Sequence, residues 1–287
     1  YLFIAEDEGL LRFASGAVHQ TIYFPEVKAF HICHPPLAEQ QRIVGVLHDA
    51  FAGLATAQAH AEKNFQSARA IFESHLHFVF TQNGDGWVGK KLGDLAELIT
   101  KGTTPTSAQH NFVGDGINFV KVESLSATGE FLKHKLAHIT PECHEALKKS
   151  QLQSGDILFS IAGALGRTAI VSHDILPANT NQALAIIRLK KDAGLLHRFI
   201  LTVLRTGLVL DQIAKAKGGV AQENLSLAQL RDFDILIPPL AQQQGIVMSL
   251  DALHTETQRL EVLYLQKQTA LAELKKSLLH QAFSGAL

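Results

Sequence analysis

The sequence predicts an α+β protein, in which one mixed α/β domain is flanked by two long α-helices that pack on each other as an antiparallel coiled coil. Two observations lead to this fold class. A motif near the N-terminus recurs near the C-terminus, each time opening about 45 residues with few helix breakers. Between the two copies, residues 84–237 carry short strand and helix patterns separated by turn residues.

The composition limits the class of protein. The chain has 287 residues, a net charge of −1 and 46% hydrophobic residues, which excludes a disordered chain and suggests more than one structural unit. Its longest apolar run, 199–213, is interrupted by Arg205 and Asp211, so we expect no membrane span. Two cysteines cannot form a disulfide framework, so we expect a reducing, cytoplasmic location. The near-neutral charge by itself argues against a polybasic nucleic-acid binder.

The internal repeat is the strongest signal. Over residues 30–80, an ungapped alignment with residues 233–283 gives 15 identities in 51 positions, which indicates a duplication. In each copy a short apolar strand, 29–33 or 233–237, runs into two prolines that end it. Because the chain opens with Tyr1 inside an amphipathic pattern, we expect residues 1–36 to be the tail of a first domain in a longer protein.

Long spacer helices are predicted for residues 37–83 and 238–287. Steps of four and three residues visit mainly apolar side chains in both helices, which is typical of a coiled coil. We expect the polar exceptions, Asn64 and Lys267, to reach solvent, with a register-setting role as the alternative. The predicted seams are Ile43, Leu47, Ala50, Leu54, Ala57, Ala61, Asn64, Ala68, Ile71, His75 and Phe78 in the first helix, and Ile246, Leu250, Leu253, Thr257, Leu260, Tyr264, Lys267, Leu271, Leu274, Leu278 and Gln281 in the second.

Residues 84–237 predict a mixed α/β domain. They carry 17 Lys and Arg against 15 Asp and Glu, which gives this segment a slight positive charge. Strand patterns are followed by turn residues, and one long apolar segment predicts a helix. The expected elements are a strand and a short helical stretch over 87–99, strands at 117–122, 156–161, 168–171 and 183–189, and a helix at 195–216.

Motifs of catalysis and metal binding are absent from the sequence. It has no Walker-type glycine loop, no nucleophile elbow, no His-Glu zinc motif and no Asn/Asp-Pro-Pro-aromatic tetrapeptide of adenine methyltransferases. Four potential zinc ligands, His134, His138, Cys143 and His144, lie within eleven residues, but their spacing fits no standard zinc pattern. We therefore expect neither an enzyme nor a metal site.

Several motifs occur in an order that resembles the specificity (S) subunit of type I restriction-modification systems. Pro35–Val44 resembles the start of that family's spacer helices, and the second copy has Gln242 and Gly245 in place of the usual Glu and Arg. Leu278–Leu287 is similar to the family's helix end. Residues 91–96 and 100–105 resemble the start of a target recognition domain, and residues 154–158, 163–167 and 179–182 resemble its later blocks.

The resemblance implies a non-catalytic reader of double-stranded DNA. Residues 1–36 would be the tail of a first target recognition domain, 37–83 the central helix, 84–237 a complete recognition domain that reads half of a split target, and 238–287 the distal helix. Methylation (M) and restriction (R) subunits would dock on the helices, and S-adenosylmethionine, ATP and magnesium would bind those partners rather than this chain. A second copy of this chain could stand in for the missing domain.

Candidate DNA-binding residues combine cations, amides, hydroxyls and exposed glycine backbone. Base edges require paired donors and acceptors, whereas phosphates require cations or backbone N–H groups. Each loop can also be an ordinary turn, and the cations near 215–217 also suit a helix end. The candidates are Lys101, Gly102, Thr103, Thr104, Lys121, Gly163, Gly166, Arg167, Asn179, Thr180, Asn181, Gln182, Lys215, Lys217, Gly219, Gln222 and Asn224.

Two other functions stay open on the sequence alone. The chain could be the recognition module of a fused restriction-methylation enzyme, or a coiled-coil scaffold that does not bind DNA. Catalysis by the isolated chain would contradict the reader, and no binding to DNA at low salt would favour the scaffold.

Overall fold

The computed structural model describes residues 34–82, 84–126, 128–191, 194–216 and 224–287, together with four short stretches before residue 34. The chain divides into two compact units. Unit 1 comprises residues 1–71 and 254–287, and unit 2 comprises residues 72–253. The strand predicted at 29–33, and most of the predicted tail 1–36, lie outside the described residues. Within the described part of the chain, no helix combines the length and apolarity that a membrane crossing requires.

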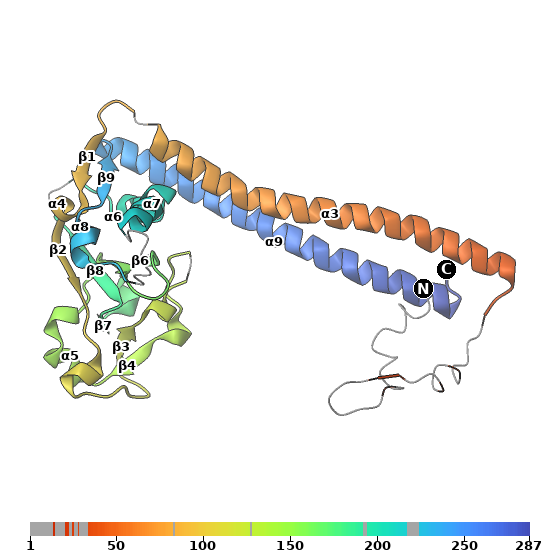
Figure 1. The fold of residues 1–287 in the computed structure, drawn as a ribbon, viewed down its shortest axis with the longest axis horizontal. Helices are drawn as coiled ribbons and strands as arrows, with labels where there is room; N and C mark the ends of the chain where they lie inside the picture. The colour runs from red at the N-terminus through yellow and green to blue at the C-terminus, as the bar shows by residue number, and fades with distance from the viewer. Residues whose placement is uncertain are drawn as a thin grey trace. The chain divides into compact units, whose positions relative to one another are not determined.

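Unit 1 contains most of the two long helices, α3 (Leu37–Thr81) and α9 (Leu240–Ser284), which are 45 residues each. They lie side by side and run antiparallel (Figure 1). Arg69 Nε donates to Glu261 Oε2 at 3.2 Å, and Gln268 Nε2 donates to Glu62 Oε2 at 2.8 Å. At the other end of the pair, Arg42 donates to the carbonyl oxygen of Leu287. These contacts confirm the predicted antiparallel pairing.

The helix seam follows the predicted spacing only in part. Leu47, Leu54, Ala61 and Ala68 are buried at intervals of seven residues, as predicted. Asn64 is exposed, as predicted, and Phe65 is half-buried in its place; Lys267 is likewise exposed and Gln268 half-buried.

The prediction is wrong further along each helix, where Ile71 is 49% and Leu274 48% exposed. A strict 3.5-residue repeat drifts by about 20° per heptad on a straight α-helix, so the buried face moves to the next residue. The drift occurs at equivalent positions of the two repeat copies.

Unit 2 is built around a four-stranded antiparallel sheet in the order β2-β8-β5-β6. Its strands are β2 (Ala96–Lys101), β8 (Leu184–Leu189), β5 (Ile157–Ser160) and β6 (Thr168–Ile170). The last three match predicted strands. The 87–99 region was expected to end in a helical stretch, but it contains β1 (Val88–Lys91), the single-turn helix α4 (Leu92–Leu95) and then β2. Extended structure resumes at Ala96 because Leu95, Ala96 and Ile99 are buried in the core beside β8.

Two smaller sheets complete the strands of unit 2. One has the order β4-β3-β7, with β3 (Ile117–Val120) antiparallel to β4 (Ala137–Ile139) and parallel to β7 (Ala178–Thr180). The other pairs β1 with β9 (Asp234–Ile237), the strand predicted from the second repeat copy. Because β7 is short and partly polar, the sequence did not predict it.

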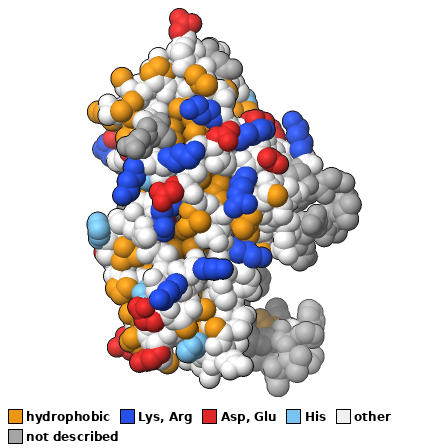
Figure 2. Space-filling view, turned by 90° about the vertical axis from the view of Figure 1, so that its left-hand side faces the viewer, with side chains coloured by type: hydrophobic (Ala, Val, Ile, Leu, Met, Phe, Trp, Pro, Cys, Tyr) orange, Lys and Arg blue, Asp and Glu red, His pale blue; other side chains and the backbone are white. Residues whose placement is uncertain are grey.

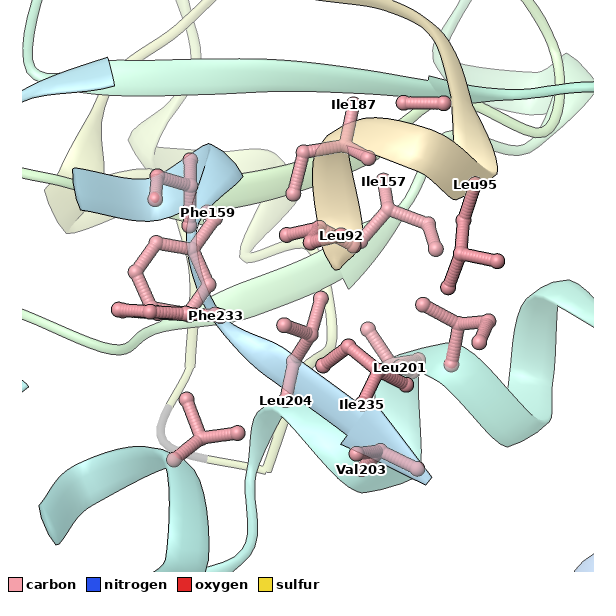
Figure 3. Packing of buried hydrophobic residues seen from close by; sticks show 14 of the residues in the cluster. Leu92, Leu95, Ile157, Phe159, Ile187, Leu201, Val203, Leu204, Phe233 and Ile235 are labelled. Atoms are coloured by element: carbon pink, nitrogen blue, oxygen red, sulfur yellow. The ribbon is translucent and has the colours of Figure 1, made fainter. Parts of the chain in front are cut away.

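Helices cover the sheet and close the core of unit 2. Leu92 and Leu95 of α4, Leu204 of α6, and Phe159 and Ile187 of the sheet point into one buried apolar cluster (Figure 3). The helix predicted at 195–216 is broken at Arg205 and Thr206. The helices are α5 (Pro141–Ala146), α6 (His197–Leu204), α7 (Gly207–Ala216) and α8 (Leu227–Arg231), with single 3-10 turns at Pro105–Ala108, Val122–Ser124, Lys133–Lys135, Lys148–Ser150 and His173–Ile175.

Candidate nucleic-acid interface

Two candidate loops that lie far apart in the sequence meet in unit 2. The first, residues 101–104, begins at the last residue of β2, and the second, residues 179–182, begins in β7 and runs into the connection to β8. The Thr103 amide donates to the Thr180 carbonyl oxygen at 3.1 Å, and the Gly102 amide donates to the Leu184 carbonyl oxygen at 3.4 Å. The Thr104 hydroxyl donates to the side-chain oxygen of Gln182. The structure therefore brings residues 101–104 and 179–182 into one surface. This contact could not be predicted from the two separate sequence motifs.

Glycine is required where these loops cross. A Cβ atom on Gly102 would lie 2.0 Å from the Thr180 carbonyl oxygen and 2.6 Å from the Asn181 carbonyl oxygen. No side chain fits at such distances, because the obstacle is backbone. Gly102 is thus a packing residue, while its neighbour Lys101 is exposed and Thr103 and Thr104 are half-buried.

Asn179 and Thr180 hold the loop from inside. Both are 0% exposed. Asn179 Nδ2 donates to the Leu147 carbonyl oxygen at 3.1 Å and the Ser150 hydroxyl at 3.0 Å, and Asn179 Oδ1 bonds to the His144 ring. The Thr180 hydroxyl donates to the Val120 carbonyl oxygen at 2.9 Å. As placed, neither side chain can reach a base edge without opening of the domain.

Asn181 and Gln182 are closer to the surface. The Asn181 Oδ1 atom accepts from the Ala183 amide at 3.1 Å, which is an Asx turn, and its side chain is half-buried. Gln182 is exposed. Together with Lys101, Thr103 and Thr104, these residues give the surface one cation, two hydroxyls and two amides.

The 163–167 loop joins β5 to β6 as a tight turn. Gly163 and Gly166 have φ values of 72° and 81°, in the left-handed region that favours glycine. Arg167 donates to the carbonyl oxygens of Val122 at 3.3 Å and Leu125 at 2.9 Å. The guanidinium group therefore ties this turn to the 122–125 segment and is half-buried.

Of the other predicted residues, Lys121 lies beside the second loop, because it directly follows Val120 of β3, which pairs with Thr180. The Lys121 ammonium lies 4.5 Å from the centre of the Phe112 ring and 3.8 Å from a Glu123 carboxylate oxygen. Lys215 is exposed at the end of α7, and Asn224 is exposed before α8. Lys217, Gly219 and Gln222 lie outside the described residues.

No metal centre forms from the described part of the chain, where no three His, Cys, Asp or Glu side chains come together. Cys143 is buried in α5, and this burial raises the pKa of its thiol, which disfavours the thiolate form that binds zinc. His144 bonds to Asn179 instead. In the same helix, bonds from its own backbone N–H and the Thr140 hydroxyl lower the pKa of Glu142.

Lysine and arginine side chains, with some aspartate and glutamate side chains among them, are spread across the face shown in Figure 2, the side that carries β1, β2 and α5 in Figure 1. Exposed cations of these segments and their neighbours include Lys90, Lys101, Lys148 and Lys149. Lys148 and Lys149 belong to none of the motifs predicted from the sequence. Their adjacency in the sequence was visible, but their place beside β2 depends on the fold.

The fold and this surface define a class: a mixed α/β domain with a polar, cationic loop surface, which in the sequence lies between two duplicated long helices. A family model for the type I restriction modification DNA specificity domain matches residues 84–265. The chain belongs to this family, as its motifs predicted.

Two curated relatives are specificity subunits. The chain is 25% identical over 276 residues to the type I restriction enzyme EcoBI specificity subunit of Escherichia coli, covering 88% of this chain and 57% of that protein. It is 26% identical over 215 residues to the putative MjaX specificity subunit of Methanocaldococcus jannaschii, covering 71% of this chain and 49% of that protein. The chain thus spans about half the length of these curated relatives.

Solved structures share the fold. A chain from a study of complex assembly and conformational transition of the type I R-M system superimposes with a TM-score of 0.76 at 20% identity, covering 99% of this chain and 69% of that one. The HsdS subunit from Thermoanaerobacter tengcongensis gives a TM-score of 0.63 at 20% identity, covering 100% of this chain and 70% of that one. The mixed fold with two long helices is therefore the fold of these subunits.

Proposed function

We propose that this chain is a non-catalytic DNA sequence-recognition subunit of a type I restriction-modification complex, and that residues 84–237 read one half of a split target. The observation that carries the proposal is the joining of loops 101–104 and 179–182 into one polar, cationic surface, within the region that matches the specificity-domain family. Hydroxyl and amide side chains suit base edges, and Lys101 suits a phosphate.

The long helices are proposed to set the spacing between half-sites and to dock the methylation and restriction subunits. Exposed apolar side chains on α9 of unit 1 support docking: Val262, Leu263 and Leu265 are 56%, 53% and 56% exposed. These three exposed apolar side chains lie within four consecutive residues of α9, and clustered apolar exposure is a feature of interaction surfaces. We propose that S-adenosylmethionine, ATP and magnesium act in those partners, in the cytoplasm, and that this chain binds none of them.

Selection from a pool of random duplexes tests the proposal. The full chain, alone and with its cognate methylation subunit, is incubated with the pool at low salt, where phosphate contacts strengthen binding. Enrichment of a short half-site is the expected result. Retention of duplexes without any sequence preference in both arms would contradict sequence reading. Methyl transfer by the chain alone would contradict the non-catalytic assignment.

A further inference from the structure

We propose that Lys148 and Lys149 contact DNA phosphates beside the joined loops, so that the segment Pro141–Gln151 is a second part of the recognition surface. This inference rests on the proposed DNA-reading function. It assigns a role to two residues that none of the loop motifs contains. Three observations carry it: the anchoring of the segment, its place beside β2, and the absence of carboxylate partners for its lysines.

The 141–151 segment is anchored to Asn179, the first residue of the 179–182 loop. Asn179 donates to the Leu147 carbonyl oxygen and the Ser150 hydroxyl, which flank the two lysines. Gln151 forms a β-bridge with Asn179, and its side chain donates to the His144 carbonyl oxygen at 2.8 Å. Ser150 is fully buried. The backbone of Lys148 and Lys149 is therefore held between fixed points, while their side chains are exposed.

The anchoring residue also brings the lysines to the joined loops. Asn179 is followed by Thr180, whose carbonyl oxygen accepts from Thr103. The turn Lys148–Ser150 contacts β2, the strand that ends at Lys101. The 141–151 segment, the 179–182 loop and the 101–104 loop thus form one continuous part of unit 2.

These lysines differ from other cations of unit 2 in their partners. Lys91, Lys121, Lys133 and Arg188 each lie within 4.0 Å of a carboxylate oxygen. Among the described residues, no carboxylate comes that close to Lys101, Lys148 or Lys149. The nearest acidic residues in the sequence, Glu142 and Glu145, belong to α5, and Glu142 interacts with the backbone at the start of that helix.

Exposed cations without carboxylate partners are the groups that release counterions from DNA. Each phosphate neutralised adds about 0.9 to the steepness of log K against log salt. The competing explanation is structural, because cations also stabilise the C-terminal end of a helix such as α5. The two roles make different predictions for the salt dependence of binding.

The test compares two double variants of the full chain, Lys148→Ala/Lys149→Ala and Lys190→Ala/Lys191→Ala. The control pair is also consecutive and exposed, but it follows β8 at the end where Leu189 pairs with Ala96, whereas Lys101 pairs with Ala185. The measurement is fluorescence anisotropy on a mixed-sequence duplex at several salt concentrations, with thermal unfolding as a check on the fold.

In the Lys148/Lys149 variant, the slope of log K against log salt should decrease in magnitude by about two. The variant should bind every sequence on the order of tenfold more weakly, and its half-site preference should not change. The control should keep the wild-type slope. An unchanged slope, an equal loss in the control, or lower thermal stability as the only effect would overturn the role of the lysines and leave the reading function intact. Failure of the wild-type chain to bind any duplex would overturn both.

Discussion

Gly102 and Thr180 approach so closely that a Cβ atom on the glycine would lie 2.0 Å from the threonine carbonyl oxygen. The adjacent Thr103–Thr180 hydrogen bond then fixes the two loops to each other. This contact joins the end of β2 to the end of β7 and so builds the proposed reading surface.

Gly102→Ala should separate the two loops. The new methyl group meets backbone, which cannot rotate away, so we expect a loss of about 1–3 kcal/mol in the free energy of unfolding, as for other overpacked sites. Denaturant unfolding measures it. Gly89→Ala is the matched control, since its Cβ would lie 3.8 Å from a Leu236 side-chain carbon. Equal stability of the two variants would contradict the close approach.

Gln182 should contribute to sequence preference and not to phosphate binding. Its side chain is exposed and neutral, and it accepts a hydrogen bond from Thr104. Gln182→Ala should therefore relax the preference at one position of the half-site by about 1–3 kcal/mol and leave the salt slope unchanged.

Lys101→Ala should have the opposite effect. The slope of log K against log salt should decrease in magnitude by about one, and the base preference of the half-site should be retained. Gln244→Ala, an exposed amide on α9, serves as the control. A uniform loss of affinity in Gln182→Ala would argue against base contact.

Asp156 is the buried member of an ion pair that holds the central sheet. Its side chain is 0% exposed and accepts from Arg188 Nε and Nη2, both at 2.8 Å, and from the Gln153 amide at 2.8 Å. The bonds to Asp156 raise the pKa of Arg188. Asp156→Ala leaves a half-buried guanidinium group and an amide without their acceptor, and should cost about 3 kcal/mol of unfolding free energy.

The exposed pair Arg198–Asp251 offers a comparison within unit 2, because it has the same bidentate geometry at the surface. Asp251→Ala should cost less than about 1 kcal/mol, since exposed pairs are screened by water. The assay is urea unfolding. Similar costs for the two aspartates would show that burial does not determine the strength of the Asp156 pair.

Ala61 tests the helix seam of unit 1. It is 1% exposed, whereas Ala59, two residues earlier on the same helix, is exposed. Ala61→Leu should push α3 away from α9 and lower the stability of the pair by about 1–3 kcal/mol, while Ala59→Leu should have little effect. Thermal melting followed by far-UV circular dichroism distinguishes them. Greater destabilisation by Ala59→Leu than by Ala61→Leu would contradict the packing of the Ala61 face of α3 against α9.

The sequence predicted the elements whose signals are local. The duplicated motif predicted β9 and both long helices, and apolar strand patterns predicted β5, β6 and β8. β7 was missed because its polar residues, Asn179 and Thr180, satisfy their hydrogen bonds in the interior. The heptad pattern could not predict the shift at Asn64 and Lys267, because the exact helical twist depends on packing.

The candidate site was predicted as a set of separate loops. Residues 101–104 carry a lysine, a glycine and two hydroxyls, and residues 179–182 carry three amides and a hydroxyl, which stand out in the sequence. Their mutual contact, and the position of Lys148 and Lys149 beside them, depend on pairing between segments that are remote in the sequence. Arg167 looked like a phosphate ligand, but its bonds to Val122 and Leu125 are set by tertiary structure.

The most direct test of half-site reading by residues 84–237 is a methylome of cells that carry this chain with its methylation subunit. Residues 84–237 are exchanged for the corresponding domain of a relative with another target, and methylated sites are mapped before and after. The expected result is a split motif in which one half changes and the other half is retained. An unchanged motif, or the loss of both halves with the methylation complex still active, would contradict the assignment of half-site reading to this domain.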